Sequence, residues 1–353
     1  TLDGKKPKSG IMITGSHNPP NYNGFKMVLG GSAIYGDQIQ ALRKRIEDRK
    51  FATGQGARST FDIFPMYLER IVGDVKLARP IKIAVDCGNG VGGAFAGKLF
   101  RALGCEVQEL FCEVDGHFPN HHPDPAHIEN LQDLIKNLQT TDNELGLAFD
   151  GDADRLQMVD ASGRLFNGDE LLYVLAKDRI ERGQVMGGVV GTLMTNLAVE
   201  NAIKGLGIGF ERANVGDRYV LELLKQKGWI IGGEGSGHLL CLDQHSTGDG
   251  TIAALQVLAA MSQSKRSLVQ LLDSVKIFPQ VLLNIKFKAG YDWKTDNTLK
   301  SKISQVESDL KGTGRVLIRA SGTEPVLRVM VEAQDGDVAM GSAKSIADLI
   351  PIA

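Results

Sequence analysis

The sequence has little of several features that would each indicate a particular class of protein. It has only four cysteines among 353 residues, and none form a C-x-x-C pair. A disulfide framework or a cysteine-based zinc site is therefore not indicated, and the cysteines are typical of small buried residues in a reducing compartment. No apolar run approaches the ~20 residues that a membrane helix needs, and no signal peptide opens the chain. We expect a cytoplasmic protein.

The chain also lacks an excess of either charge. It carries 40 Lys and Arg against 42 Asp and Glu, a net charge of -2. This balance gives no electrostatic reason to expect a nucleic acid or a membrane surface as partner. Glycine, by contrast, is abundant: 42 of 353 residues, about 12% against a usual ~7%. Glycines at strand ends are typical of loops that approach a ligand closely.

Short apolar runs alternate with helical patterns along the chain, which favours α/β units with mainly parallel sheets. We expect helices at 93–103, 127–138 and 217–227, among others. A Gly-, Ser- and Thr-rich stretch at 52–60 is the first candidate linker. Only one short strand precedes the first candidate loop, so we expect domain 1 to be incomplete at its N-terminus. The expected domains are 1–60, 61–160, 161–276 and 277–353.

The strongest local signal is "AFDGDADRLQMVD", in which Asp150, Asp152 and Asp154 alternate directly after an apolar strand. In a loop that leaves a strand, this spacing can turn three carboxylates toward one point, as Mg²⁺ requires. The alternatives are a polar turn and the start of an EF-hand loop. The EF-hand pattern fails, because Arg155 stands where it needs Gly and Ala161 where it needs Glu.

A second signal is "RASGTEPVLR", residues 319–328, between two expected strands. Its arginine, its hydroxyls and the amides near its glycine could hold a phosphate, while a plain hairpin turn is the alternative. A third is "GGEGSGHLL", residues 232–240, where Glu234 and Ser236 could face one way and bind paired sugar hydroxyls. A Gly-rich strand end is its alternative.

The fourth stretch is "ITGSHNPP", residues 13–20, which places Ser16 beside His17. We expect no Ser-His hydrolase triad, because adjacent side chains in an extended loop point apart and no Gly-x-Ser-x-Gly elbow is present. A serine that carries phosphate is a different possibility, since a phosphoserine adds oxygen ligands for a cation.

Two further patterns have competing interpretations. "CGNGVGG" matches a dinucleotide fingerprint through Gly88, Gly90 and Gly93, with close strand-to-helix packing as the alternative. It would make the chain an NAD-dependent oxidoreductase. "HFPNHHPDPAH" gathers four histidines, but its prolines and spacing favour a surface loop over a zinc site.

The four loops taken together, in this order, resemble the α-D-phosphohexomutase superfamily: "TGSHNP", "DGDADR", "GEGSGH" and "RASGTEP". The resemblance covers essentially the whole chain. It implies a multi-domain α/β architecture with three α/β modules of mixed sheets and a smaller C-terminal α+β domain, whose four loops surround one cleft. It also implies an enzyme, a phosphosugar mutase of the isomerase class, which moves a phosphoryl group between C1 and C6 of a hexose phosphate. Mg²⁺ would be its metal, and a hexose 1,6-bisphosphate its intermediate and activator.

The resemblance implies a role for each matching residue. Ser16 would be the phosphorylated serine and would bind Mg²⁺ together with Asp150, Asp152 and Asp154. The candidates for charge stabilisation and proton transfer are Lys26, Arg155 and His238. The implied substrate-binding residues are His17, Glu234, Ser236, His238, Arg319, Ser321, Gly322 and Thr323.

The two parts of the chain resemble different members of the superfamily. Up to about Arg155 the sequence is most similar to bacterial phosphomannomutase/phosphoglucomutases, and beyond it to phosphoglucosamine mutases. Because the "GEGSGH" loop reads the sugar in this architecture, we favour glucosamine 6-phosphate and 1-phosphate as substrates. Mannose or glucose phosphate, and an inactive fragment that only binds sugar phosphate, are the alternatives.

Overall fold

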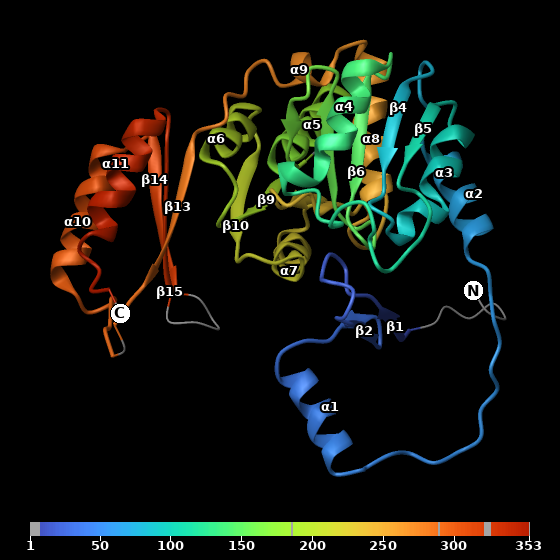
Figure 1. The fold of residues 1–353 in the computed structure, drawn as a ribbon, viewed down its shortest axis with the longest axis horizontal. Coiled ribbons are helices and arrows are strands. Elements are labelled where there is room, and N and C mark those ends of the chain that lie inside the picture. The colour runs from blue at the N-terminus through green and yellow to red at the C-terminus, as the bar shows by residue number, and fades with distance from the viewer. Residues whose placement is uncertain (1–7, 185, 289, 321–325, 353) are drawn as a thin grey trace. The chain divides into compact units, whose positions relative to one another are not determined.

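The computed structural model describes residues 8–184, 186–288, 290–320 and 326–352 (Figure 1). The chain divides into two compact units, Thr1–Arg164 and Leu165–Ala353. Each unit contains two sheets. One short strand, β8 (Leu165–Phe166), falls in unit 2 by this division but belongs to the larger sheet of unit 1.

Unit 1 begins with a small antiparallel sheet. Its strands are β1 (Gly10–Ile13), β2 (Phe25–Leu29) and β3 (Ser32–Ala33), in that order. Helix α1 (Asp37–Glu47) follows and has no buried residue. No helix or strand interrupts residues 51–60, where glycine and hydroxyl side chains favour a loop. The loop between β1 and β2 carries Ser16, so this small sheet positions the serine.

The larger sheet of unit 1 has the order β5-β4-β6-β7-β8. Strands β4, β5 and β6 run parallel and β7 antiparallel to β6. Gly146 in β6 leaves room for α4, because a Cβ there would lie 2.9 Å from side-chain atoms of both Leu134 and Leu138. The elements are β4 (Lys82–Asp86), β5 (Glu106–Leu110), β6 (Leu145–Phe149), β7 (Leu156–Asp160), β8 (Leu165–Phe166, at the division), α2 (Phe64–Asp74), α3 (Ala96–Ala102) and α4 (Gln132–Thr140).

Unit 2 begins with a four-stranded mixed sheet of order β10-β9-β11-β12. Helix α5 starts at a capping box, in which Asn167 accepts from the Glu170 N–H and the Glu170 side chain bonds back. Nearly every residue of α8 is buried, which makes it the centre of this part. The elements are α5 (Gly168–Glu181), β9 (Gly188–Thr192), α6 (Leu197–Gly205), β10 (Gly209–Ala213), α7 (Asp217–Lys227), β11 (Ile231–Gly233), β12 (Leu239–Cys241), α8 (Gly250–Ser264) and α9 (Leu268–Leu271).

The rest of unit 2 is an antiparallel sheet of order β13-β15-β14, with two helices on one face (Figure 1). Leu327, Val329 and Val331 alternate along β15 and are fully buried in a core with residues of both helices. This period of two is what a strand with one covered face requires. The elements are β13 (Gln280–Lys286), α10 (Asn297–Asp309), β14 (Gly314–Ala320), β15 (Val326–Ala333) and α11 (Gly336–Ala347).

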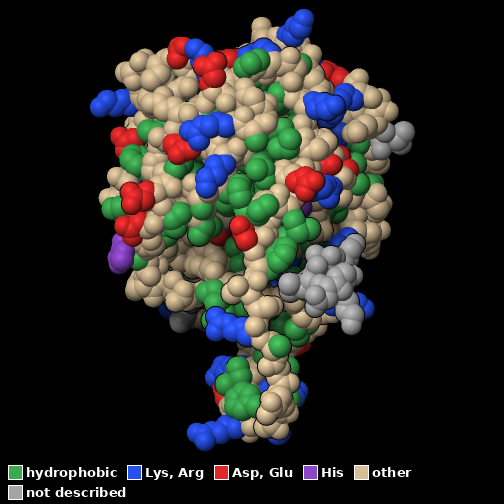
Figure 2. Space-filling model, turned by 90° about the vertical axis from the view of Figure 1, so that its right-hand side faces the viewer, with side chains coloured by type: hydrophobic (Ala, Val, Ile, Leu, Met, Phe, Trp, Pro, Cys, Tyr) green, Lys and Arg blue, Asp and Glu red, His purple; other side chains and the backbone are tan. Residues whose placement is uncertain are grey.

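The surface and the helices agree with the composition of the chain. Figure 2 shows one face on which Lys and Arg are interspersed with Asp and Glu, with hydrophobic side chains between them. Within the described ranges, no helix has both the length and the apolar content needed to cross a membrane.

Most expected elements are present, with two corrections. Helix α7 spans the expected residues 217–227. The sheets are mixed, as the family resemblance implied, rather than mainly parallel, as the alternation of strands and helices indicated, and two of the four are wholly antiparallel. The helices expected at 93–103 and 127–138 each begin with a 3₁₀ turn instead, Val91–Ala94 before α3 and Ile128–Leu131 before α4. A Cβ at Gly93 would lie 2.1 Å from the Cys112 carbonyl oxygen, so only glycine fits at this point of the turn.

Candidate active site

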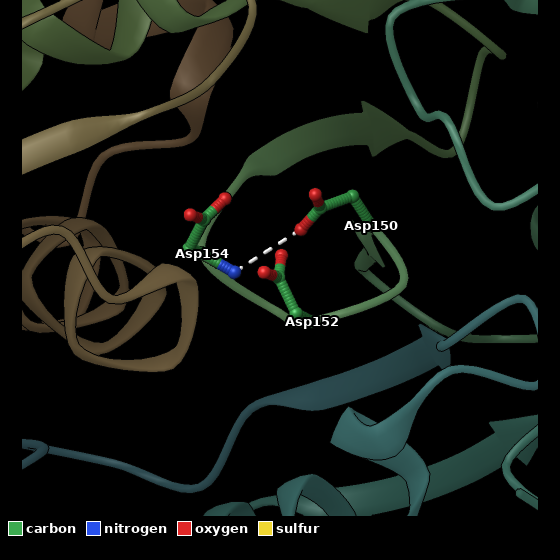
Figure 3. Close-up of side chains that lie close together, drawn as sticks. All are labelled: Asp150, Asp152 and Asp154. Atoms are coloured by element: carbon green, nitrogen blue, oxygen red, sulfur yellow. Dashed lines mark hydrogen bonds between the residues drawn. The ribbon is translucent and has the colours of Figure 1, made fainter. Parts of the chain in front are cut away.

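Three carboxylates gather in the turn that joins β6 to β7 (Figure 3). Asp150, Asp152 and Asp154 each offer an oxygen, and these oxygens lie within 4.8 Å of one another. The turn is held from inside, because Asp150 Oδ1 accepts the backbone N–H groups of Asp154 and Arg155, both at 3.1 Å. Among the described residues, this is the one group of three or more His, Cys, Asp or Glu side chains close enough to hold a metal ion.

Ser16 lies against this cluster. Its hydroxyl donates to Asp150 Oδ2 at 2.8 Å, and its backbone N–H donates to Thr14 Oγ1 at 2.8 Å. Thr14 in turn donates to Asp152 Oδ2 at 3.0 Å. The approach is close: a Cβ at Gly151 would lie 2.0 Å from the Ser16 carbonyl oxygen, so only glycine fits there. Ser16 and Asp152 both line a cleft of about 270 Å³ in unit 1.

Lys26 on β2 supplies positive charge to the cluster. Its Nζ lies 2.8 Å from Asp152 Oδ2 and 2.6 Å from Asp154 Oδ2. Burial disfavours the charged amine, but the two carboxylates outweigh it and raise the pKa of Lys26. Lysine therefore stays protonated, and it partly balances a site that is otherwise rich in negative charge.

The third carboxylate, Asp150, is fully buried. Burial, together with the charges of Asp154 and Asp152, raises its pKa to about 7, although the Ser16 hydrogen bond opposes the shift. Burial and the repulsion between the three groups thus keep Asp150 partly protonated near neutral pH. A bound cation would relieve this repulsion.

The structure corrects one expectation about Ser16. Adjacent side chains were expected to point apart, yet Ser16 Oγ lies 3.1 Å from His17 Nδ1. The expectation assumed an extended loop, whereas Ser16 has a φ of 52°, in the left-handed region, which turns the two side chains to the same side. Burial and the nearby charge of Arg155 lower the pKa of His17, which favours the neutral imidazole.

The glycines of "CGNGVGG" make room for the protein's own backbone. A Cβ at Gly90 would lie 2.7 Å from the Gly151 carbonyl oxygen, and a Cβ at Gly93 would lie 2.1 Å from the Cys112 carbonyl oxygen. The loop is therefore packed against the Asp150–Asp154 turn, as expected for close packing rather than for a dinucleotide site. In the histidine-rich loop, His121 Nε2 lies 3.1 Å from the buried Asp86 carboxylate, which gives this histidine a structural role.

Unit 2 has a cleft of about 610 Å³ beside the β11–β12 turn. Glu234 and Ser236 line it, with the buried Asp169 and with Asn196. The turn is well fixed, since the Gly216 N–H donates to Glu234 Oε1 at 2.8 Å, and Gly168 packs against it so closely that a Cβ would lie 2.0 Å from the Glu234 carbonyl oxygen. His238 is 5% exposed and its ring lies against Gly248, so among the described residues it is not part of the cleft lining.

A group of charged residues that the sequence analysis missed holds the loop between β9 and α6. Arg212 Nη1 donates to the Thr192, Leu193 and Thr195 carbonyls. Arg315 on β14 donates to two of the same carbonyls and to Glu332 Oε2, at 2.6 Å. Glu332 is fully buried and also accepts the Leu197 N–H. These residues fix one wall of the cleft. No local motif indicates them, because they come from distant parts of the chain.

Of the four residues expected to bind phosphate, only Arg319 lies among the described residues. Arg319 lies on β14 directly opposite Arg328 on β15. Burial and the charge of Arg328 lower the pKa of Arg319. Arg328, which ends the motif but was not among the expected site residues, has a buried Nε with no hydrogen-bond partner within the described part of the chain. The other three candidates, Ser321, Gly322 and Thr323, lie outside the described residues.

The fold and these groups define a multi-domain α/β enzyme equipped for chemistry on phosphates, with a serine hydroxyl, clustered carboxylates and paired arginines. Four family models match the chain in order. They are phosphoglucomutase/phosphomannomutase alpha/beta/alpha domain I (residues 2–53), domain II (65–163), domain III (167–278) and the C-terminal domain (282–349).

Individual proteins agree with these models. The chain is 59% identical to a phosphoglucosamine mutase from Polynucleobacter asymbioticus, over 97% of this chain and 78% of that protein. A phosphoglucosamine mutase from Cupriavidus taiwanensis is 45% identical, with 97% and 78% covered. The crystal structure of a phosphoglucomutase/phosphomannomutase family protein from Burkholderia thailandensis matches with a TM-score of 0.84 and 35% identity, covering 99% of this chain and 78% of that one.

The chain belongs to the phosphoglucomutase/phosphomannomutase family, within the α-D-phosphohexomutase superfamily. The expected fold class and the expected enzyme class, a phosphosugar mutase among the isomerases, are confirmed. The Polynucleobacter protein aligns on both sides of Arg155, so both parts of the chain are similar to one relative. The expected domain limits and the roles of individual residues stay predictions.

Proposed function

We propose that this enzyme interconverts glucosamine 6-phosphate and glucosamine 1-phosphate, with Ser16 as the phosphate carrier and a 1,6-bisphosphate as the intermediate. The observation that carries the proposal is the hydrogen bond from Ser16 Oγ to Asp150, at 2.8 Å, inside the carboxylate cluster. The similarity to phosphoglucosamine mutases over almost the whole chain supports the choice of sugar.

The donor set fits a magnesium ion. Mg²⁺ prefers oxygen ligands, and the cluster offers three carboxylates. Asp152 Oδ1 is buried with no hydrogen-bond partner among the described residues, and a cation would satisfy it. The ion would be held by Asp150, Asp152, Asp154 and a phosphate on Ser16. When bound, it would neutralise negative charge on the phosphate oxygens.

The protein's own residues would handle the rest of the transfer. In the first half-reaction the bond between phosphorus and Ser16 Oγ breaks and a bond from phosphorus to a sugar hydroxyl oxygen forms. The sugar hydroxyl loses its proton, and Ser16 Oγ takes up a proton to become a hydroxyl. In the second half the other phosphate of the bisphosphate returns to Ser16. Catalysis of such transfers depends mainly on positioning and on stabilising charge. Lys26 and Arg155 would supply positive charge, and His17, whose Nδ1 lies 3.1 Å from Ser16 Oγ, is the candidate for holding the proton.

Paired arginines in unit 2 support the assignment of a phosphate anchor. Two like charges directly opposite on neighbouring strands destabilise a sheet, and Arg319 and Arg328 occupy such positions. An anion bound between or beside them would offset this destabilisation of the sheet, because guanidinium groups bind phosphate oxygens by charge-assisted hydrogen bonds. We therefore assign the phosphate that is not being transferred to Arg319 and Arg328, and keep Ser321, Gly322 and Thr323, which lie outside the described residues, as further candidates.

The charge of the cleft in unit 2 supports an amino sugar. Its described lining residues include the carboxylates Glu234 and Asp169 and no lysine or arginine. A protonated amine at C2 of the sugar would be attracted to this cleft, whereas the neutral hydroxyl of glucose or mannose would gain less. Glu234 and Ser236 would bind the remaining sugar hydroxyls.

The test is transfer of labelled phosphate to the protein. The enzyme is incubated with Mg²⁺ and, separately, with labelled glucosamine 1,6-bisphosphate and glucose 1,6-bisphosphate, and phosphopeptides are mapped by mass spectrometry. We expect label on Ser16, and a higher kcat/KM for glucosamine 1-phosphate than for glucose or mannose 1-phosphate. Ser16→Ala should abolish both labelling and turnover.

A matched serine provides the control. Ser9 lies in the same sheet region, where its hydroxyl accepts the Gly30 N–H, and Ser9→Ala should keep wild-type labelling and turnover. Label on another residue, or full turnover by the Ser16→Ala variant, would contradict the carrier role. A preference for mannose or glucose 1-phosphate would contradict the amino sugar alone.

A further inference from the structure

Two cysteines that are far apart in the sequence lie side by side in unit 1. Cys87 follows β4 and Cys112 follows the neighbouring strand β5, and their sulfur atoms are 3.6 Å apart. Both are free thiols; Cys87 is fully buried and Cys112 is partly exposed. The hydrogen-bonding contact with Cys112, together with burial, raises the pKa of the Cys87 thiol. The more accessible thiol is therefore that of Cys112.

The segment 87–93 joins this pair to the carboxylate turn through tight packing. A Cβ at Gly92 would lie 3.6 Å from Cys87 Sγ and 3.1 Å from Ala153 Cβ, between Asp152 and Asp154. The Val91 N–H donates to the Gly151 carbonyl at 3.0 Å. On the opposite side, Gly93 is in contact with the Cys112 backbone. Gly92 is thus packed between Cys87 and the turn, whereas Val91 on the same segment is exposed and lines the cleft of unit 1.

We propose that Cys87 and Cys112 form a redox-sensitive pair, which a hydroperoxide converts to a disulfide and which thereby displaces the Asp150–Asp154 turn. The oxidation itself is independent of the proposed function. Its effect on turnover rests on the proposed function, because it assumes that the carboxylate turn serves catalysis.

The reaction balances with hydrogen peroxide as the oxidant. The Cys112 thiolate attacks one peroxide oxygen, the O–O bond breaks, and Cys112 becomes a sulfenic acid while the second oxygen leaves as water. The Cys87 sulfur then attacks the sulfenic sulfur, the S–O bond breaks and the S–S bond forms. The hydroxyl leaves as water with the Cys87 proton. Two thiols and one peroxide thus give one disulfide and two waters.

Disulfide formation would require movement at this site. A sulfur–sulfur bond is about 2.05 Å long, so the sulfur atoms must approach each other by about 1.5 Å from their present 3.6 Å. Because Gly92 is buried between Cys87 and Ala153, part of this movement would pass through Gly92 to Ala153. A misplacement of about 1 Å can cost on the order of a hundredfold in rate. We expect a loss of that order in kcat/KM on oxidation, reversed by dithiothreitol.

The experiment combines peptide mapping, hydrogen exchange and turnover. The intact protein is treated with hydrogen peroxide, free thiols are blocked with iodoacetamide, and peptides are mapped without reduction. We expect a peptide that links Cys87 to Cys112. The amides of Asp154 and Arg155, which donate to Asp150 in the reduced protein, should exchange faster after oxidation. If the reduced enzyme showed no mutase activity, the proposed function would fail, while the linked peptide and the exchange rates would still test the pair.

Two sets of variants act as controls. Cys112→Ser and Cys112→Ala should form no link and keep their exchange rates and activity after peroxide treatment. Cys105→Ser removes another buried thiol of the same unit and should still form the link. If iodoacetamide blocked both Cys87 and Cys112 after peroxide treatment, both would still be free thiols, and this result would refute the redox-sensitive pair. A link with unchanged exchange at 154–155 would refute the coupling to the turn, as would equal inactivation of the Cys112 variants.

Discussion

The protein places like charges together in two regions, and it balances them differently. In unit 1 the carboxylates of Asp150, Asp152 and Asp154 share one turn, and Lys26 reaches two of them. In unit 2 Arg319 and Arg328 lie opposite each other, and no carboxylate pairs with either of them within the described residues. Each arrangement costs stability by itself, so each indicates a ligand of opposite charge. The acidic cluster already has a partial counter-charge, whereas the arginine pair depends on its ligand.

The largest effect is expected from changing the acidic cluster. Asp152 accepts from both Thr14 and Lys26 and faces the proposed metal position. Asp152→Asn should lower kcat by on the order of 10²–10³, as removal of one transition-state stabilising group does, and should weaken Mg²⁺ binding measured by calorimetry. Asp160→Asn, at the other end of β7, is the matched control and should leave both unchanged. Unchanged kinetics in Asp152→Asn would contradict the metal assignment.

The second prediction separates stability from function at the arginine pair. Arg328→Gln removes the repulsion with Arg319, so the melting temperature should stay the same or rise slightly. The same change removes a charge-assisted hydrogen bond of ~1.5–3 kcal/mol to the substrate phosphate, so KM should rise roughly tenfold or more. The measurements are thermal unfolding without ligand and steady-state kinetics.

Arg315 provides the contrasting control for this prediction. It lies on the same strand as Arg319 but pairs with Glu332, which is fully buried. Breaking such a pair leaves a buried charge without compensation and costs about 3–5 kcal/mol, so Arg315→Gln should lower the melting temperature clearly. If Arg328→Gln destabilised the protein as much as Arg315→Gln, Arg328 would be structural rather than a ligand of phosphate.

The sequence could predict the features that lie within one short segment, but not those that depend on distant segments coming together. The carboxylates and Ser16 belong to short motifs, so their identity could be read locally, and the strands and the helix at 217–227 follow from their apolar periodicity. The Cys87–Cys112 contact and the Arg315–Glu332 pair depend on which strands are neighbours, and no local pattern contains that information. Helix α2 was also missed, although its apolar residues follow a helical period; of its residues only Ile71 is buried.

The smallest effect concerns a single buried carboxylate outside the Asp150–Asp154 turn, on whose pKa the charges of Glu332 and Arg212 act in opposite directions. Asp169 is fully buried in the wall of the unit 2 cleft, and burial raises its pKa to about 6, although the Asn196 N–H opposes the shift. The usual value for Asp is 3.8, so between about pH 4 and 6 the folded protein binds a proton that the unfolded chain releases. This group therefore makes the protein less stable as pH rises through that window, by on the order of 3 kcal/mol in total.

Asp169→Asn tests this sign. Asparagine is neutral at every pH and keeps an oxygen that can accept the Asn196 N–H. The gain in melting temperature over the wild type should therefore be largest at pH 8 and should shrink toward pH 4.5. Asp296→Asn is the opposite control, because hydrogen bonds from the backbone and from Tyr291 lower the pKa of this partly exposed helix-capping carboxyl. Its contribution is present above the ordinary pKa and lost as pH falls. Equal shifts for Asp169→Asn at both pH values would mean that its carboxylate is compensated in the folded state, as the carboxylate turn is by Lys26.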